Sequence, residues 1–184
     1  ETSGVCHFAY DDEETCLAEV RYLLSMLPQN NRENPPRTEC ADPADRRGDA
    51  LLDLVPVDGN RPYDMTKVIE EIVDDGEYLE VHERWARNII CALARLDGQV
   101  VGIVANQPQA LAGVLDIEAS EKAARFVQMC DAFNIPIVTL LDVPGLVDDV
   151  IDPAETREVL VRSLAMLQTK HADLPSRKHG NPPQ

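Results

Sequence analysis

The stretch NIICALARLDGQVVGIVANQ, residues 88–107, predicts a β-hairpin. Two apolar runs rich in β-branched residues flank Asp97 and Gly98, and a two-residue Asp-Gly turn supplies the positive φ angles that a tight hairpin requires. Both runs are almost continuously apolar, which is typical of strands buried on both faces. The hairpin is therefore expected inside an α/β layer structure.

A helix and a third strand follow the hairpin. Residues 116–133, DIEASEKAARFVQMCDAF, predict a helix that begins after the capping residue Asp116. Its predicted apolar face consists of Ala119, Ala123, Phe126, Val127, Cys130 and Phe133. Residues 135–141, IPIVTLL, then predict a buried strand. The order strand, strand, helix, strand favours the α/β class.

The chain before the hairpin predicts mostly helix. Residues 4–10 have the length and residue types of a strand, and residues 11–28 predict a helix with Asp11 and Glu14 in a capping box. Residues 77–86 predict a short helix or a turn. Residues 62–75 predict a further helix, whose apolar positions are Met65, Val68, Ile69, Ile72 and Val73.

Two segments differ in character from the rest. Residues 29–60 are rich in Pro, Asn, Asp and Arg and predict a linker, in which residues 49–56 form a short docked turn. The last helix, residues 152–170, is expected to begin with Asp152 as its cap and Pro153 at its first position. Its apolar stripe is Leu160, Leu164 and Leu167.

The composition excludes several classes of function. The 184 residues suit one domain, or one domain with an appendage. A net charge of −16 disfavours binding to nucleic acid and to anionic membranes, and no apolar run is long enough to predict a membrane span. The five cysteines form no C-x-x-C pair and are expected to be reduced thiols of a cytosolic protein. The four histidines lack metal-ligand spacing, so neither a metal site nor a catalytic side chain is expected.

Two loops of small residues are the candidate functional elements. Residues 106–113 follow the hairpin and residues 142–145 follow the strand at 135–141. If those two strands are parallel neighbours, both loops lie on one edge of the sheet and border a cleft, where backbone N–H groups can face an oxyanion. The alternative is an ordinary connection from strand to helix.

Long blocks of the sequence resemble one enzyme family. RPYDMTKVIEEIVDDGEYLEV (61–81), ARLDGQVVGIVANQP (94–108), AGVLDIEASEKAARFVQMCDAFNIPIVTLLDVPG (112–145) and LPSRKHGNPPQ (174–184) closely resemble the carboxyltransferase (β) subunit of biotin-dependent acyl-CoA carboxylases. The propionyl-CoA and methylmalonyl-CoA carboxylase branch is the nearest. The resemblance implies an incomplete crotonase-like ββα spiral of the ClpP/crotonase type.

The resemblance also implies a domain division. Residues 1–29 correspond to the end of a first crotonase-like domain, 30–60 to a linker and 61–145 to the start of a second domain. Residues 146–184 correspond to the terminal helix and tail of that second domain. Gly145 serves both as the Gly of DVPG and as the Gly before LVDDVIDP, so a large block of the family's second domain is expected to be missing there.

The implied activity is transfer of a carboxyl group from carboxybiotin to the α-carbon of a short acyl-CoA, propionyl-CoA or acetyl-CoA. Biotin would be carried on a partner, the biotin carboxylase/biotin carrier subunit, and the family forms cytoplasmic hexamers. Family members stabilise developing negative charge with pairs of backbone N–H groups, and no residue of this chain matches those catalytic pairs. The alternative function is that of an inactive homologue acting only as an interaction or assembly module.

The resemblance assigns cleft residues one by one. Asn106, Gln107 and Pro108 match the family loop at the biotin side of the cleft, and Asp142, Val143, Pro144 and Gly145 match the loop that lines the cleft beneath it. Because the helix at 152–170 lacks the strands that it covers in the family, exposed apolar faces are expected. We therefore predict oligomerisation or marginal stability.

Overall fold

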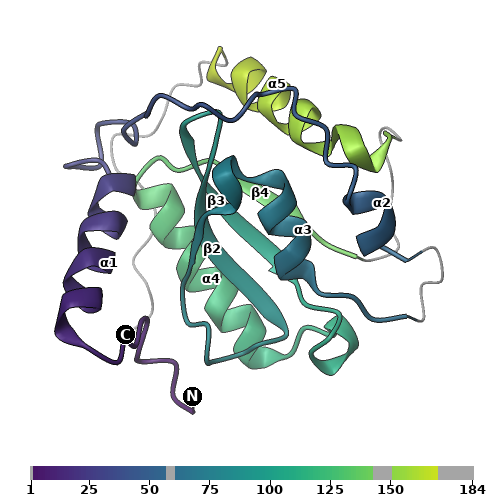
Figure 1. Ribbon diagram of the computed structural model, residues 1–184. Helices are drawn as coiled ribbons and strands as arrows, with labels where there is room; N and C mark the ends of the chain where they lie inside the picture. Colours follow the sequence, from purple (N-terminus) through teal and green to yellow (C-terminus); the bar gives the residue numbers. More distant parts are fainter. Residues whose placement is uncertain (1, 57–60, 143–150, 170–184) are drawn as a thin grey trace.

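A four-stranded mixed sheet organises the protein (Figure 1). The computed structural model describes residues 2–56, 61–142 and 151–169. The strands lie side by side in the order β1-β2-β3-β4. In chain order the elements are α1 (Glu13–Met26), α2 (Leu51–Leu54), α3 (Met65–Ile72), β1 (Tyr78–Glu80), β2 (Ile89–Leu96), β3 (Gln99–Asn106), α4 (Ile117–Ala132), β4 (Ile137–Leu140) and α5 (Thr156–Gln168), with short 3₁₀ turns η1 (Asp74–Gly76), η2 (Leu111–Gly113) and η3 (Pro153–Glu155).

The predicted hairpin is confirmed. Strands β2 and β3 are antiparallel, from the pair Ile89 and Asn106 to the pair Leu96 and Gln99. Between them Asp97 and Gly98 have φ angles of 51° and 73°, as a two-residue turn of this kind requires. A side chain at residue 98 would collide with the carbonyl oxygen of Thr38 in the linker, so glycine is needed there for space as well as for φ.

The α/β class is confirmed by the strand that follows α4. Strand β4 pairs with β3 in parallel, with Gly102 opposite Ile137 and Ala105 opposite Leu140. Helix α4 makes the crossover that a parallel pair needs. The carboxyl ends of β3 and β4 therefore lie at the same edge of the sheet, which was the condition for the two candidate loops to meet.

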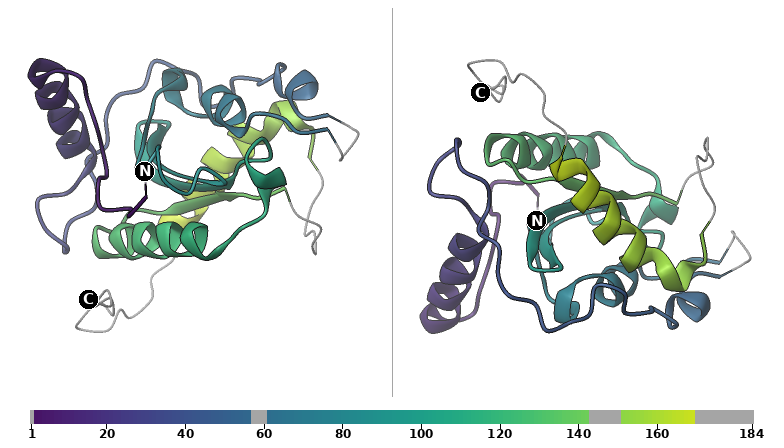
Figure 2. Two further views of the ribbon diagram at one scale, coloured as in Figure 1. Left: turned by 90° about the horizontal axis from the view of Figure 1, so that it is seen from below. Right: turned by 90° about the horizontal axis from the view of Figure 1, so that it is seen from above.

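Helices cover both faces of the sheet (Figures 1 and 2). Helix α4 packs on one face with the end of α1, around a core that includes Met26, Ile89, Cys91, Leu93, Val100, Ala119, Phe126 and Cys130. Helices α2, α3 and α5 pack on the other face, around Leu51, Met65, Ile69, Ile72, Leu96, Val101, Ile103, Val138 and Leu164. Each fully buried aliphatic side chain stabilises the fold by about 1.5–3 kcal/mol relative to an exposed one.

The predicted apolar faces of α3, α4 and α5 hold with two exceptions, Val127 and Leu167. All five predicted positions of α3 and its C-cap are buried, and Asp116 caps α4 by accepting a hydrogen bond from Ala119 N at 2.9 Å. In α4, Val127 is 40% exposed, and Lys122, which the predicted apolar face did not include, is fully buried. In α5, Leu164 is buried and Leu160 is partly buried, but Leu167 is 48% exposed.

Two local predictions were wrong, and a third holds only in part. Residues 4–10 form no strand. A strand needs a ladder of backbone hydrogen bonds, and the described contacts to the turn after β1 include a single one, from His82 N to His7 O at 3.0 Å. For residues 77–86 a short helix or a turn was expected; 81–84 form a turn, but 78–80 form strand β1, because pairing with β2 overrides the local preference. Helix α1 is capped by Asp12, not Asp11; its carboxylate accepts from Thr15 N at 2.8 Å.

The predicted linker is packed against the rest of the structure. The docked turn at 49–56 is confirmed as α2, and Leu51 is buried in the same core as α3 and α5. Gly48 N donates to Ala154 O at 2.9 Å, which joins the linker to η3. The domain boundaries at residues 29, 60 and 145 remain predictions.

Helix α5 is anchored by a buried arginine. Arg157 is 1% exposed and donates from Nη2 to Asp74 Oδ1 at 2.7 Å and from Nη1 to Ile72 O at 2.8 Å. Asp74 also accepts from the two hairpin-turn amides, Asp97 N at 2.9 Å and Gly98 N at 2.8 Å. Burial opposes ionisation of Asp74, but these donors outweigh it and lower the pKa of its carboxyl. The Arg157–Asp74 pair thus joins α5, the end of α3 and the hairpin.

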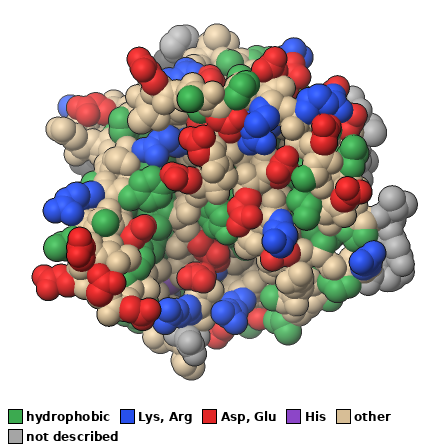
Figure 3. Space-filling view, in the orientation of Figure 1, with side chains coloured by type: hydrophobic (Ala, Val, Ile, Leu, Met, Phe, Trp, Pro, Cys, Tyr) green, Lys and Arg blue, Asp and Glu red, His purple; other side chains and the backbone are tan. Residues whose placement is uncertain are grey.

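On the face in Figure 3, acidic and basic side chains are interspersed. Within the described residues, no helix is long and apolar enough to cross a membrane.

Candidate functional site

The first residues of the two candidate loops, Asn106 and Asp142, meet at one edge of the sheet. Asn106 ends β3, and Asp142 lies two residues after the end of β4. The side-chain oxygen of Asn106, a 3% exposed residue, accepts a hydrogen bond from Asp142 N at 2.9 Å. The structure therefore brings Asn106 and Asp142 together. The predicted cleft residues Val143, Pro144 and Gly145 lie outside the described residues.

Gln107 joins the same edge to the start of α3. Its side-chain oxygen accepts from Met65 N at 3.1 Å, and its Nε2 donates to Asp64 Oδ1 at 2.8 Å. Its backbone N donates to Asn88 O at 3.0 Å, and the neighbouring Pro108 is buried. Asn106 and Gln107 thus hold the edge in place with their side chains.

Tyr63 and Asp64 also belong to this edge, and the sequence did not indicate them. Burial, followed by the nearby carboxylate of Asp142, raises the pKa of Tyr63 to about 12, so its hydroxyl stays protonated and hydrogen-bonds to Asp142. Asp64 caps α3 by accepting from Thr66 N at 3.1 Å. The capping position of Asp64 before a helix is a local signal that could have been noticed. The contact with Gln107 could not, because it spans 43 residues.

The loop after β3 contains a left-handed turn. Leu111, Ala112 and Gly113 have φ angles of 49°, 53° and 73°. A non-glycine residue in such a conformation costs on the order of 1 kcal/mol or more. Gly113 is required for space, because an added Cβ would lie 2.6 Å from Asn106 Nδ2.

Hydrogen bonds hold this turn on both sides. Gly113 N donates to Ala110 O at 2.9 Å, and Asn88 Nδ2 donates to Val114 O at 2.8 Å. The backbone N–H groups of Leu111 and Ala112 have no hydrogen-bond partner among the described residues, and both residues are exposed. The loop therefore offers two adjacent backbone donors next to the Asn106–Asp142 edge.

The described residues of this edge offer hydrogen-bond donors and acceptors. Among the described residues, no group of three or more His, Cys, Asp or Glu side chains is arranged to hold a metal ion. The side-chain oxygen of Asn106 and both side-chain polar atoms of Gln107 are bound internally, whereas the backbone N–H groups of Leu111 and Ala112 have no partner among the described residues. Fixed backbone donors are suited to stabilising an oxyanion.

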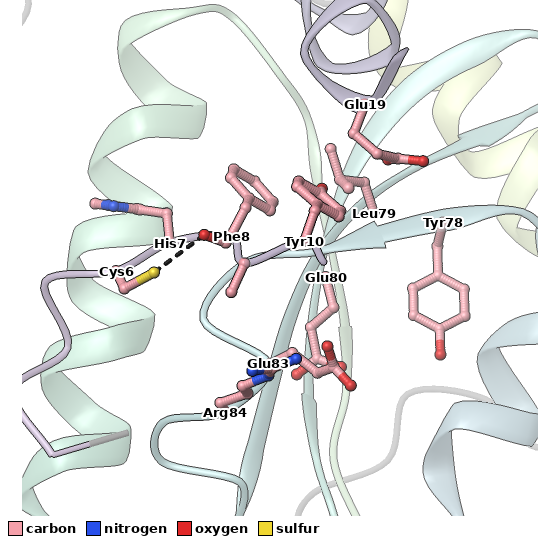
Figure 4. Close-up of a pocket in the computed structure, with 11 residues that line it drawn as sticks. Cys6, His7, Phe8, Tyr10, Glu19, Tyr78, Leu79, Glu80, Glu83 and Arg84 are labelled. Carbon is pink, nitrogen blue, oxygen red and sulfur yellow. Dashed lines mark hydrogen bonds between the residues drawn. The ribbon is translucent and has the colours of Figure 1, made fainter. Parts of the chain in front are cut away.

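A pocket of about 470 Å³ lies elsewhere, between residues 6–10, α1 and the β1 edge of the sheet (Figure 4). It contains none of the predicted cleft residues. Its polar lining includes Tyr10, Glu80 and Glu83, and the side chains of Glu80 and Glu83 lie close together in Figure 4. The sequence could not indicate this pocket, because residues 4–10 were expected to form a strand.

Glu80 is tied to the buried Lys122. Lys122 Nζ donates to the carbonyl oxygens of Ile89 at 2.8 Å, His82 at 3.1 Å and Trp85 at 3.1 Å, and lies 3.4 Å from Glu80 Oε1. Burial lowers the pKa of Lys122 and raises that of Glu80, while the attraction between the two opposes both shifts. Lys122 fixes the turn after β1 against α4.

Comparison with known proteins assigns the chain to a family. The family model "Carboxyl transferase domain" matches residues 1–147. A methylmalonyl-CoA decarboxylase subunit alpha of Veillonella parvula is 54% identical over 143 residues, which are 78% of this chain and 28% of that protein. A propionyl-CoA carboxylase carboxyltransferase subunit of Haloferax mediterranei is 54% identical over 144 residues, with the same two coverages.

A solved structure extends the similarity. Transcarboxylase 12S, with hydrolysed methylmalonyl-coenzyme A bound, superimposes with a TM-score of 0.88 and 31% identity over 98% of this chain and 55% of that one. The match therefore includes α5, which lies beyond the residues that the family model matches.

The two kinds of comparison agree on fold and ancestry. The chain spans about 28% of the length of the curated relatives named above. The expected crotonase-like carboxyltransferase fold, present in part, is confirmed by the match to transcarboxylase 12S. The chain belongs to the carboxyl transferase domain family.

Proposed function

We propose that the protein containing this chain is the carboxyltransferase component of a biotin-dependent acyl-CoA carboxylase. The observation that carries the proposal is the family match over residues 1–147, which includes the loop after β3 and Asp142. The substrate would be a short acyl-CoA, propionyl-CoA or acetyl-CoA. Propionyl-CoA is favoured, because several relatives at 46–54% identity are propionyl-CoA carboxylase subunits.

The proposed cleft lies at the edge formed by the two loops. Asn106, Gln107 and Pro108 would border its biotin side, and residues 142–145 would line it beneath. Carboxybiotin supplies the carboxyl group in this chemistry. The backbone N–H groups of Leu111 and Ala112 would lie against an oxygen on which negative charge develops, where one such donor is worth about 3–4 kcal/mol in other enzymes.

Asn106 and Gln107 would act as positioning residues. Asn106 fixes the backbone of Asp142, and Gln107 fixes the start of α3, so together they set the distance between the two loops. Displacement of a reacting group by about 1 Å can reduce a rate by about a hundred-fold. Their contribution would therefore appear in kcat more than in KM.

The partners follow from the same proposal. A biotin carboxylase/biotin carrier subunit would deliver biotin, and the protein would assemble with copies of itself. Transcarboxylase 12S is described as a hexamer, which supports a homo-oligomer. All five cysteines are free thiols, which suits the cytoplasmic location that we propose.

The test reconstitutes the full-length protein with a biotin carboxylase and biotin carrier subunit. Addition of ATP, propionyl-CoA and ¹⁴C-bicarbonate should give acid-stable label on the acyl-CoA. Asn106→Ala should lower kcat by about ten-fold to a hundred-fold with a smaller change in KM. The matched control is Gln109→Ala, an exposed side chain of the same loop.

Two outcomes would overturn the proposal. Absence of label with a verified carboxylated partner would exclude carboxyl transfer to propionyl-CoA, and acetyl-CoA would then be tried in the same assay. Tight binding to the partner without turnover on either substrate would favour the assembly-module alternative. If Asn106→Ala and Gln109→Ala have the same kcat, Asn106 does not act as a positioning residue.

A further inference from the structure

One buried asparagine fixes both ends of the loop after β3. Asn88 lies directly before β2 and is 2% exposed. Its backbone oxygen accepts a hydrogen bond from Gln107 N at 3.0 Å, and its side-chain Nδ2 donates to Val114 O at 2.8 Å. The first bond falls at the start of the loop and the second at its end, so a single residue sets the distance between the two.

The same side chain reaches the start of α4. A hydrogen bond from Ala119 N, followed by one from the side chain of Asn88, lowers the pKa of the Asp116 carboxyl. A side-chain amide nitrogen carries two hydrogens, so Asn88 can donate to Val114 and to Asp116 at once. The end of the loop and the cap of α4 are therefore bound to the same side chain.

Lys122 holds Asn88 itself in place. Its ammonium donates to the carbonyl oxygens of Ala86 at 3.5 Å and Ile89 at 2.8 Å, which lie on either side of Asn88 along the chain. The same turn is closed by a backbone hydrogen bond from Ile89 N to Ala86 O at 3.2 Å. Because Lys122 is fully buried in α4, Asn88 is supported from the core of the protein.

The outer half of the loop has few apolar contacts to hold its shape. The side chains of Leu111 and Val114 are 66% and 64% exposed. Leu111 and Ala112 have left-handed φ angles, which are unfavourable for residues other than glycine. Such a conformation persists only where the surrounding structure holds it. The direction of the Leu111 and Ala112 N–H groups therefore depends on the hydrogen bonds at the ends of the loop.

We propose that Asn88 is a positioning residue for carboxyl transfer, which holds the backbone donors of Leu111 and Ala112 toward the cleft. This role rests on the proposed function. Asn106 and Gln107 set the distance between the two loops, whereas Asn88 sets the shape of one of them. Oxyanion donors accelerate a reaction when they are already in place before charge develops, so loss of the Asn88 amide should lower kcat and leave the binding of acyl-CoA largely unchanged.

The test uses the full-length protein reconstituted with its partner, ATP, propionyl-CoA and ¹⁴C-bicarbonate. Asn88→Ala removes both hydrogens of the side-chain amide, and Asn88→Asp keeps the shape of the side chain but offers no hydrogen at neutral pH. Each should lower kcat by about ten-fold to a hundred-fold, with a change of less than about three-fold in KM for propionyl-CoA. The matched control is Asn134→Ala, whose side-chain amide also donates to two backbone oxygens, Asn31 O at 3.0 Å and Glu33 O at 2.8 Å, beyond the other end of α4. It should keep the kcat of the parent.

Hydrogen exchange measures the loop without turnover. Gly113 N and Val114 N donate to carbonyl oxygens within the loop at 2.9 Å and 3.1 Å. Their amide hydrogens should exchange about ten-fold faster in both Asn88 variants than in the parent, and at the parent rate in Asn134→Ala. Circular dichroism confirms that each variant is folded, and Asn88→Asp decides the test if Asn88→Ala is not.

The outcomes distinguish this role from the proposed function. A parent protein that labels neither acyl-CoA would overturn the proposed function and the role of Asn88 with it. An active parent whose kcat is unchanged in the folded Asn88 variants would overturn the role alone. Unchanged exchange at Gly113 and Val114 would also overturn it, because the loop would then keep its shape without the Asn88 amide. An equal fall of kcat in Asn134→Ala would attribute the effect to lost stability and overturn the positioning role.

Discussion

Replacement of Arg157 by methionine tests how α5 is attached to the fold. Methionine keeps an unbranched side chain of similar reach but removes the guanidinium. Its five described contacts would be lost: those to Asp74 Oδ1 at 2.7 Å, Ile72 O at 2.8 Å, Pro43 O at 3.0 Å, Asp42 O at 3.3 Å and Asp42 Oδ2 at 3.5 Å. These contacts reach the linker, the end of α3 and η1.

The expected loss of unfolding free energy is about 3–5 kcal/mol, because removal of one partner of a buried ion pair leaves the other charge uncompensated. Asp74 is 7% exposed, and after the substitution its carboxylate would still accept hydrogen bonds from two backbone amides of the hairpin turn, Asp97 N and Gly98 N. The loss of unfolding free energy should therefore lie nearer the lower end of that range, since those two amides still stabilise the carboxylate. The total free energy of unfolding of a domain of this size is about 5–15 kcal/mol, so the variant should be only marginally stable.

Urea denaturation followed by circular dichroism and by Trp85 fluorescence provides the measurement. The control is Arg162→Met, whose side chain is 76% exposed and pairs with Glu158 one turn earlier; its effect should stay within about 0.5 kcal/mol. In the double variant Arg157→Met/Asp74→Asn, the second change should recover part of the loss, because the uncompensated charge is gone. A loss below about 1 kcal/mol in Arg157→Met, equal to that of the control, would refute the reasoning.

Three further predictions follow from the same interactions and from the chain junction. Folding lowers the pKa of Asp74, so its ionised carboxylate contributes to the free energy of unfolding in full above its unfolded pKa of about 3.9. That contribution is lost as the pH falls through the folded-state pKa. Acid should therefore reduce the free energy of unfolding less in Asp74→Asn than in the parent. Lys122→Met should lower the free energy of unfolding in urea denaturation by about 3 kcal/mol or more, since it leaves Glu80 and four carbonyl groups without their cation; an effect equal to that of Arg162→Met would contradict the described contacts. Trypsin should release residues 126–157 as one peptide of the calculated mass, because no Lys or Arg lies between Arg125 and Arg157; a heavier peptide would show that a further block of the family's second domain lies between Gly145 and Leu146.

The elements that the sequence predicted correctly have local causes. The Asp97–Gly98 turn, the cap at Asp116 and the apolar period of α3 are each specified within a few residues. The meeting of the two loops also followed from a local pattern, since two apolar strands joined by a helix are usually parallel.

The elements that it missed have distant causes. Tyr78–Glu80 becomes a strand only because β2 is available to pair with it. The burial of Lys122 depends on carbonyl groups 33–40 residues earlier in the chain. No periodicity within α4 could show that this position faces inward. The predicted apolar exposure is seen in part, since Leu24 of α1 and Met166 of α5 are each at least 60% exposed. Oligomerisation or marginal stability remains a prediction.

The link between Asp74 and Arg157 also sets an order of events during synthesis. The hairpin turn lies 23 and 24 residues after Asp74, whereas Arg157 lies 83 residues after it. At a translation rate of about 5–20 residues per second, the ribosome needs about 4–17 s to add those 83 residues. Throughout that interval the nascent sheet holds an acidic side chain whose cation has not yet been made, and the face that α5 will cover is open. We expect the sheet to reach its final packing only when α5 arrives, so the last of the described helices completes the packing of elements that were made long before it.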